Sequence, residues 1–146
     1  MTQVDFHIIP VLQTADRYAY ATRLVAKARD RQHRVLLAVD DETMAQAVSE
    51  ALWAHPPESF MAHSLLTGHL NDADDDVQIG WHCEPGMHHD ILINLAAEIP
   101  DYFSRFERVF EVVSQEPAVL NSTRTHYRFY QDRGYPLKRH DLRDRA

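Results

Sequence analysis

Four potential metal ligands cluster around a Pro-Gly turn in the middle of this sequence, at His82, Cys83, His88 and His89. Imidazole and thiolate groups are common zinc ligands, but this spacing matches no zinc-finger or zinc-ribbon pattern. Cys83 beside a histidine also suggests a nucleophile and base, yet no orienting third group or oxyanion site accompanies the pair. We therefore expect a hairpin-like loop with surface histidines. A metal-dependent enzyme that uses residues 82–89 is kept as the alternative function.

A run of carboxylates precedes this loop, at Asp72, Asp74, Asp75 and Asp76. It lacks the full set of spaced ligands and the distal glutamate of a calcium loop. We expect a solvated acidic loop.

A third group of side chains lies near the C-terminus, where Arg124, Tyr127 and Arg128 are three and four residues apart. In a helix this spacing places all three on one face. Two guanidinium groups can hold carboxylates in a bidentate manner, and the tyrosine ring offers an apolar wall, so the face suits an acidic peptide. In the alternative interpretation, Tyr127 packs inward with Leu120 and Thr123, and the arginines are ordinary surface residues.

Charge is distributed unevenly along the chain. The net charge is -7, which argues against a protein that mainly grips phosphate backbones. Residues 124–146 nevertheless carry seven Lys or Arg and three Asp, a net +4, whereas residues 1–123 carry a net -11. A basic end on an acidic body can steer an acidic ligand to one place, although a solvated basic tail would have the same composition.

Strand and helix patterns alternate between these groups. Short apolar runs predict strands at 4–10, 34–39, 59–66, 77–82, 90–95 and 109–113, and helical periodicity predicts helices at 14–32, from Asp40 and Asp41 to before Pro56, at 101–105, and from Pro117 to near Gly134. In the first helix, Arg17 falls outside the apolar face. The alternation predicts an α/β fold with a mainly parallel sheet and helices on both faces. The four glycines form neither a dinucleotide-binding nor a P-loop motif, so no nucleotide-binding loop is expected.

The length of 146 residues favours one domain, 1–146, in which residues 137–146 form a basic C-terminal tail. No apolar run reaches the roughly 18 residues of a membrane span, and no secretory leader is evident. Cys83 is the single cysteine, which excludes an internal disulfide. These features predict a cytoplasmic protein without a membrane partner.

Several stretches resemble the chi subunit family of bacterial DNA polymerase III, and the likeness covers essentially the whole chain. The stretches are RVLL at 34–37, EALWAHPPESF at 50–60, DILINL at 90–95 and YRFY at 127–130 ahead of Gly134. The resemblance implies a Rossmann-like three-layer sandwich without a nucleotide site. It also implies a non-catalytic, cofactor-free accessory of the clamp-loader complex in DNA replication, with no direct DNA binding.

The resemblance implies two protein-binding surfaces. One binds the acidic C-terminal tail of single-stranded DNA-binding protein, whose terminal phenylalanine enters an apolar pocket. The residues matching this site are Arg124, Tyr127, Arg128 and Val113. Leu120 stands where the family has a lysine, so part of the basic rim is missing. Two outcomes are open: the tail binds more weakly, or Arg133 or Lys138 takes over the role of the lysine.

The second surface binds the psi subunit, and through it the clamp loader. Its matching residues are the aromatics Trp53 and Phe60. Exposed rings beside a Pro-Pro pair fit a protein interface. The alternative is that both rings close the core beneath the second helix.

Overall fold

A computed structural model describes residues 2–54, 64–67, 76–81 and 89–143, with the backbone alone described at 64–67. The elements in chain order are β1 (Gln3–Ile8), α1 (Thr14–Asp30), β2 (Val35–Ala38), α2 (Glu42–Trp53), β3 (Ser64–Thr67), β4 (Val77–Trp81), β5 (Ile91–Asn94), the 3-10 helix η2 (Phe103–Arg105), β6 (Arg108–Val113), α3 (Pro117–Asp132) and β7 (Leu137–Asp141). They agree with most of the elements predicted from the sequence.

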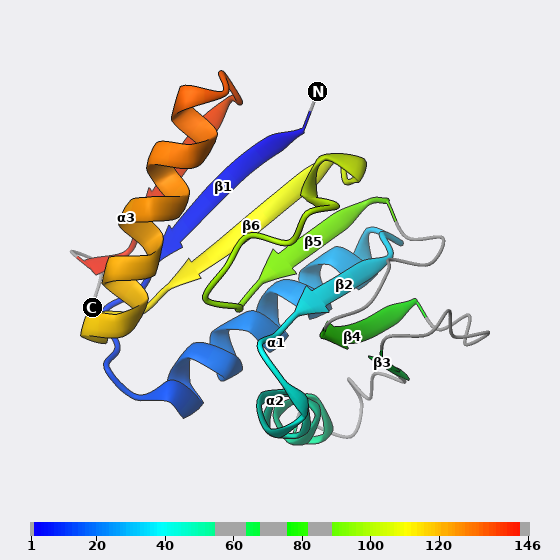
Figure 1. Ribbon diagram of the computed structural model, residues 1–146. Helices are drawn as coiled ribbons and strands as arrows, with labels where there is room; N and C mark the ends of the chain where they lie inside the picture. The colour runs from blue at the N-terminus through cyan, green and yellow to red at the C-terminus, as the bar shows by residue number, and fades with distance from the viewer. Residues whose placement is uncertain (1, 55–63, 68–75, 82–88, 144–146) are drawn as a thin grey trace.

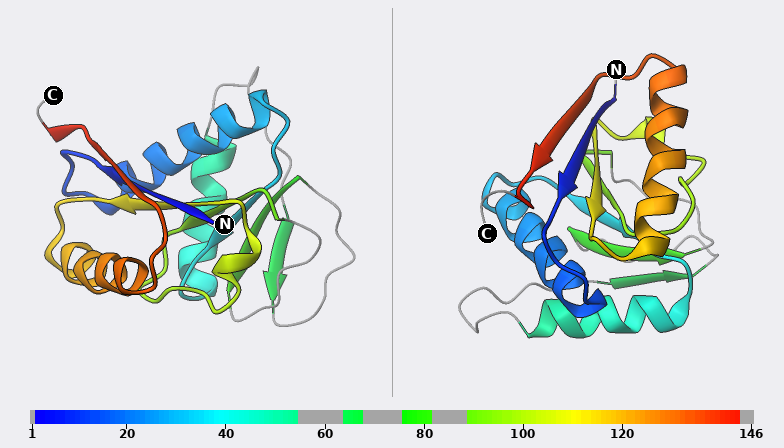
Figure 2. Two further views of the ribbon diagram at one scale, coloured as in Figure 1. Left: turned by 90° about the horizontal axis from the view of Figure 1, so that it is seen from above. Right: turned by 90° about the vertical axis from the view of Figure 1, so that its left-hand side faces the viewer.

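The strands form one seven-stranded sheet in the order β3-β4-β2-β5-β6-β1-β7 (Figure 1). Every pair of neighbouring strands is parallel. Helices α1 and α3 lie on opposite sides of β1 and β6 (Figure 2). One core cluster joins α1 and α2 to the sheet, and a second joins α3 and η2 to the other face. The predicted three-layer α/β sandwich is therefore confirmed.

Local signals in the sequence explain where the helices begin and end. The Asp41 carboxylate accepts a hydrogen bond from the Met44 backbone N–H at 2.9 Å, which caps α2 as predicted. Pro117 occupies the first turn of α3, where a missing N–H costs nothing. Gly134 has a φ of 75° just after α3, a conformation that glycine adopts without strain. No helix in the described part of the chain has the length and apolar character of a membrane span.

Two expectations about connectivity need correction. Strands β4 and β5 were expected to flank a hairpin-like loop, but each pairs in parallel with β2, on opposite sides of it. The loop residues 82–88 lie outside the described residues. The segment expected as a basic tail contains β7, which pairs in parallel with β1 at the end of the sheet. The sequence LKRHD at 137–141 lacks the apolar pattern from which a strand is predicted.

Candidate functional site

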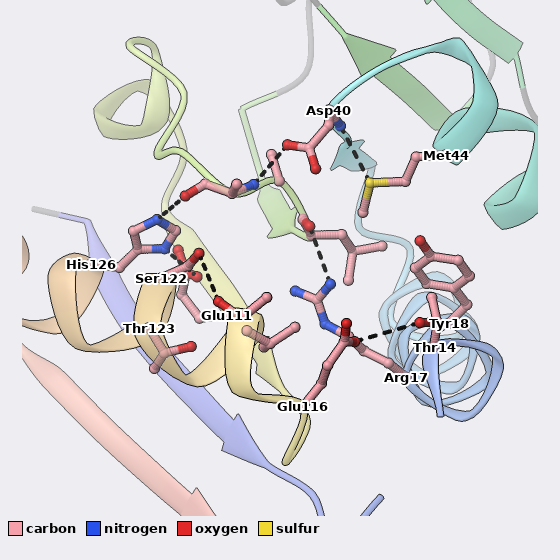
Figure 3. A pocket seen from close by; sticks show the side chains of 15 residues that line it. Thr14, Arg17, Tyr18, Asp40, Met44, Glu111, Glu116, Ser122, Thr123 and His126 are labelled. Carbon is pink, nitrogen blue, oxygen red and sulfur yellow. Dashed lines mark hydrogen bonds and ion pairs between the residues drawn. The ribbon is translucent and has the colours of Figure 1, made fainter. Parts of the chain in front are cut away.

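A crevice opens at the carboxyl edge of the sheet, where residues at the ends of β2, β5 and β6 line it together with residues of α1 and α3 (Figure 3). Ligands of α/β proteins commonly bind at such a point. The crevice has a volume of about 230 Å³, and Arg17, Glu111 and His126 are among its lining residues. All three are buried, with 8%, 3% and 4% of their surface exposed. The expectation that Arg17 lies on an outer face of α1 was therefore wrong.

These buried charges are bound to the protein itself. Arg17 donates from Nε to the Val112 carbonyl at 2.9 Å and from Nη1 to the Leu95 carbonyl at 3.3 Å. The Glu111 carboxylate bonds to His126 Nδ1 at 2.9 Å and accepts from the Tyr130 hydroxyl at 2.9 Å. These contacts tie α1 and α3 to the strand ends.

The surroundings of His126 favour its protonated form. Burial opposes the charged form, but the hydrogen bond and the charge of Glu111, together with a bond from His126 Nε2 to the Ala97 carbonyl at 2.8 Å, raise the pKa of His126. The carboxylates of Asp40 and Glu116 also line the crevice. Because Arg17 and His126 are already bound to protein acceptors and three carboxylates line the crevice, it is poorly suited to a nucleotide phosphate.

A second pocket lies between α3 and β7, with a volume of about 400 Å³. Arg124, Tyr127 and Arg128 line it together, so the structure brings these three predicted residues into one place. Phe6 and Ile8 of β1 are also among the lining residues. The pocket therefore combines an apolar surface with basic side chains.

Tyr127 satisfies part of each interpretation made from the sequence. Its ring is half-buried and lies 5.2 Å from the Phe6 ring, so it packs inward while still lining the pocket. Arg124 and Arg128 are exposed, and no carboxylate among the described residues forms an ion pair with either. Leu120 packs against the core cluster beneath α3 and does not line the pocket.

The structure supplies a third basic residue that the sequence analysis missed. Arg139 of β7 is exposed and lines the pocket. Lys138 precedes it on the strand and therefore points to the opposite face of the sheet. Arg133 lies over the Phe129 ring, 3.7 Å from its centroid, and does not line the pocket. Val113 is 2% exposed, belongs to the core cluster under α3, and is likewise absent from the pocket lining.

Trp53 ends α2 and is 54% exposed, which rules out the interpretation that its ring closes the core. An apolar groove with a volume of about 670 Å³ runs between α1 and α2, lined by Ala47, Ala51 and Ala54 among others. Phe60, the other predicted aromatic of this surface, lies outside the described residues.

The two remaining candidate groups lie mostly outside the described residues. Of the His/Cys loop only His89 is described, and it is exposed. Of the aspartate run only Asp76 is described. It forms ion pairs with Arg29 at 2.8 Å and Arg34 at 3.2 Å, and its side chain is 46% exposed.

Comparison with known proteins identifies one family over almost the whole chain. The family described as DNA polymerase III chi subunit, HolC, matches residues 1–138. A DNA polymerase III subunit chi from Pseudomonas aeruginosa is 39% identical over 97% of this chain and 98% of its own length. The subunit chi from Escherichia coli is 32% identical over 94% and 96% of the two chains, and that from Haemophilus influenzae is 27% identical over 91% and 92%.

Proposed function

This chain belongs to the DNA polymerase III chi subunit family, and from that premise we propose that it is a non-catalytic adaptor that binds the acidic C-terminal tail of single-stranded DNA-binding protein in the α3–β7 pocket. On a second surface it binds the psi subunit, which connects it to the clamp loader. Its site of action is the cytoplasm.

The observation that carries the tail-binding proposal is the composition of the pocket. Three exposed guanidinium groups, from Arg124, Arg128 and Arg139, surround the apolar side chains of Phe6 and Ile8. A tail that ends in acidic residues and phenylalanine has the complementary composition, because its carboxylates pair with guanidinium groups and its ring needs an apolar surface. The pocket volume of about 400 Å³ also falls within the range of about 300 to 1,000 Å³ that is usual for small-ligand sites.

Arg139 replaces the basic residue that is missing at Leu120. The resemblance alone suggested Arg133 or Lys138 for this role, but neither lines the pocket. In the proposed complex, α3 provides Arg124 and Arg128 from one side and β7 provides Arg139 from the other. A carboxylate-rich segment between them contacts both elements.

Titration calorimetry tests this proposal with a synthetic peptide of acidic residues ending in phenylalanine. Saturable binding is expected, with affinity falling as salt concentration rises because ions screen the arginine contacts. Arg128→Ala should weaken binding, whereas Arg133→Ala, a matched change outside the pocket, should leave it unchanged. Equal affinities for wild type and Arg128→Ala would refute the location of the site.

The proposed psi interface rests on Trp53. Large apolar side chains exposed to more than half of their surface are uncommon in the described part of this chain, where Leu12 at 65% and Trp53 at 54% are the two examples. Trp53 lies at the end of the helix that forms one wall of the α1–α2 groove. An aromatic anchor beside an apolar groove is a common arrangement for binding a partner helix.

A further inference from the structure

Three side chains with metal-binding groups meet on the α1 face of the sheet, away from the α3–β7 pocket. They are Asp5 and His7 of β1 and His140 of β7, and one ligand atom from each lies within 4.8 Å of the other two. Residues two apart on a strand point to the same face, which explains why Asp5 and His7 come together. His140 joins them because it is the register partner of His7.

His7 is the member of this cluster whose polar atoms are not all satisfied. It is 9% exposed, and its Nδ1 lies 2.9 Å from the Tyr20 hydroxyl, whereas its buried Nε2 has no hydrogen-bond partner. If Nδ1 donates its proton to the Tyr20 oxygen, the lone pair on Nε2 is left for another group. Metal-binding histidines characteristically use the second ring nitrogen in this way.

Asp5 and His140 supply the other two groups. The Asp5 carboxylate is 1% exposed, and its Oδ2 lies 3.0 Å from His140 Nε2. The side chain of His140 is 34% exposed, so one side of the cluster is open to solvent and to a water ligand. The positive charge of Arg108 opposes the binding of a metal ion here, because Arg108 Nη2 lies 2.6 Å from the same Asp5 oxygen.

We propose that Asp5, His7 and His140 form a binding site for one divalent transition-metal ion, with Zn²⁺ as the best match for two imidazoles, a carboxylate and an open position. With metal–ligand distances near 2.0 to 2.1 Å, ligand atoms around a tetrahedral ion are about 3.4 Å apart. The Asp5 oxygen and His140 Nε2, at 3.0 Å, already lie within this separation, and the other pairs of ligand atoms, which lie within 4.8 Å, need to approach by at most about 1.4 Å. Rotation of the partly exposed His140 ring provides this movement. Coordination through His140 Nε2 requires the tautomer in which that atom is unprotonated and the single proton of the neutral ring lies on Nδ1.

The test uses untagged, full-length protein stripped of metal with a chelator and titrated with Zn²⁺ by calorimetry. We expect one ion per chain, and binding weakened by roughly tenfold or more in His140→Ala and in His7→Gln. The double variant His82→Ala, His88→Ala should bind like wild type, because it leaves all three proposed ligands unchanged. Retention of wild-type affinity in His140→Ala would overturn the proposal.

Two further measurements do not depend on variants of buried residues. Arg108→Gln removes the competing charge beside Asp5 and should tighten Zn²⁺ binding, the opposite direction from the ligand variants. Titration with Co²⁺ should give visible absorption bands without the near-ultraviolet thiolate-to-cobalt band that Cys83 would produce. A strong thiolate band at one equivalent would place the metal in the His/Cys loop and refute the site at Asp5, His7 and His140.

Discussion

Arg139 is the register partner of Phe6 in the parallel pairing of β7 with β1. This places a cation beside an apolar ring at the edge of the sheet, and both side chains line the α3–β7 pocket. The basic rim and the apolar surface of the pocket therefore come from neighbouring strands, while α3 closes the opposite side.

Replacing Arg139 with alanine should reduce affinity for the acidic tail peptide roughly fivefold, equivalent to about 1 kcal/mol for one partly exposed charged contact. Lys138→Ala is the matched control. It removes one positive charge from the adjacent position of the same strand, on the other face of the sheet. Titration calorimetry at one salt concentration should show a larger loss of peptide affinity for Arg139→Ala than for Lys138→Ala. Equal losses would mean that overall charge, and not contact, is responsible.

The Tyr127 ring should contribute more to the affinity for the tail peptide than the Tyr127 hydroxyl does. Its contact with Phe6 is between rings, so Tyr127→Phe should keep most of the peptide affinity, whereas Tyr127→Ala should lower it by about 1 to 2 kcal/mol. Thermal unfolding of both variants provides the control for folding. If phenylalanine proves as damaging as alanine, the hydroxyl must contact the ligand.

Breaking the buried pair of His126 with Glu111 should cost about 3 kcal/mol of stability, because one charge would remain buried without its partner. His126→Gln tests this by urea unfolding. The folded fraction of this variant should still bind the tail peptide, since His126 does not line the α3–β7 pocket. A loss of peptide binding by protein that is shown to be folded would contradict the separation of the two sites.

The same pair should make stability depend on pH. The folded state raises the pKa of His126, so its stabilising effect is complete below the ordinary value of about 6.5 and is lost as pH rises through the folded-state value. The difference in unfolding free energy between wild type and His126→Gln should therefore shrink from pH 6 toward alkaline pH. A constant difference would show that the ring contributes as a neutral hydrogen-bonding group.

Trp53→Ala should leave stability within about 0.5 kcal/mol of wild type, because the residue is exposed. It should nevertheless prevent copurification with a coexpressed psi subunit. Leu12→Ala provides the control, since Leu12 is the other large apolar residue in the described part of the chain with more than half of its surface exposed, and it lies before α1. If both variants copurify with psi, Trp53 is not an anchor of that interface.

The sequence predicted a feature correctly where the interaction that determines it joins residues close together in the chain. Caps and turns act within a few residues, so Asp41 correctly predicted where α2 begins, and Pro117 and Gly134 correctly predicted where α3 begins and ends. The helical spacing of Arg124, Tyr127 and Arg128 likewise predicted a shared face. The family resemblance added the expected ligand, which charge and spacing alone did not specify.

Features that depend on contacts between segments far apart in the sequence were not predicted. The burial of Arg17 depends on the carbonyls of Leu95 and Val112, which are remote in sequence. The residues 137–141 looked like a charged tail because a strand at the edge of a sheet needs little apolar character. The sequence LKRHD has one apolar residue and no apolar/polar alternation, and only pairing with β1 determines which of Lys138 and Arg139 reaches the pocket.

The position of β7 at the end of the sheet has a further consequence. A terminal strand presents backbone donors and acceptors on one side without a neighbour, which invites association with the strands of other molecules. Charged side chains on such a strand act as gatekeepers against aggregation, and Lys138 and Arg139 meet that description. Arg139 would thus combine ligand recognition with protection of an open sheet edge. An apolar substitution there would threaten solubility as well as affinity.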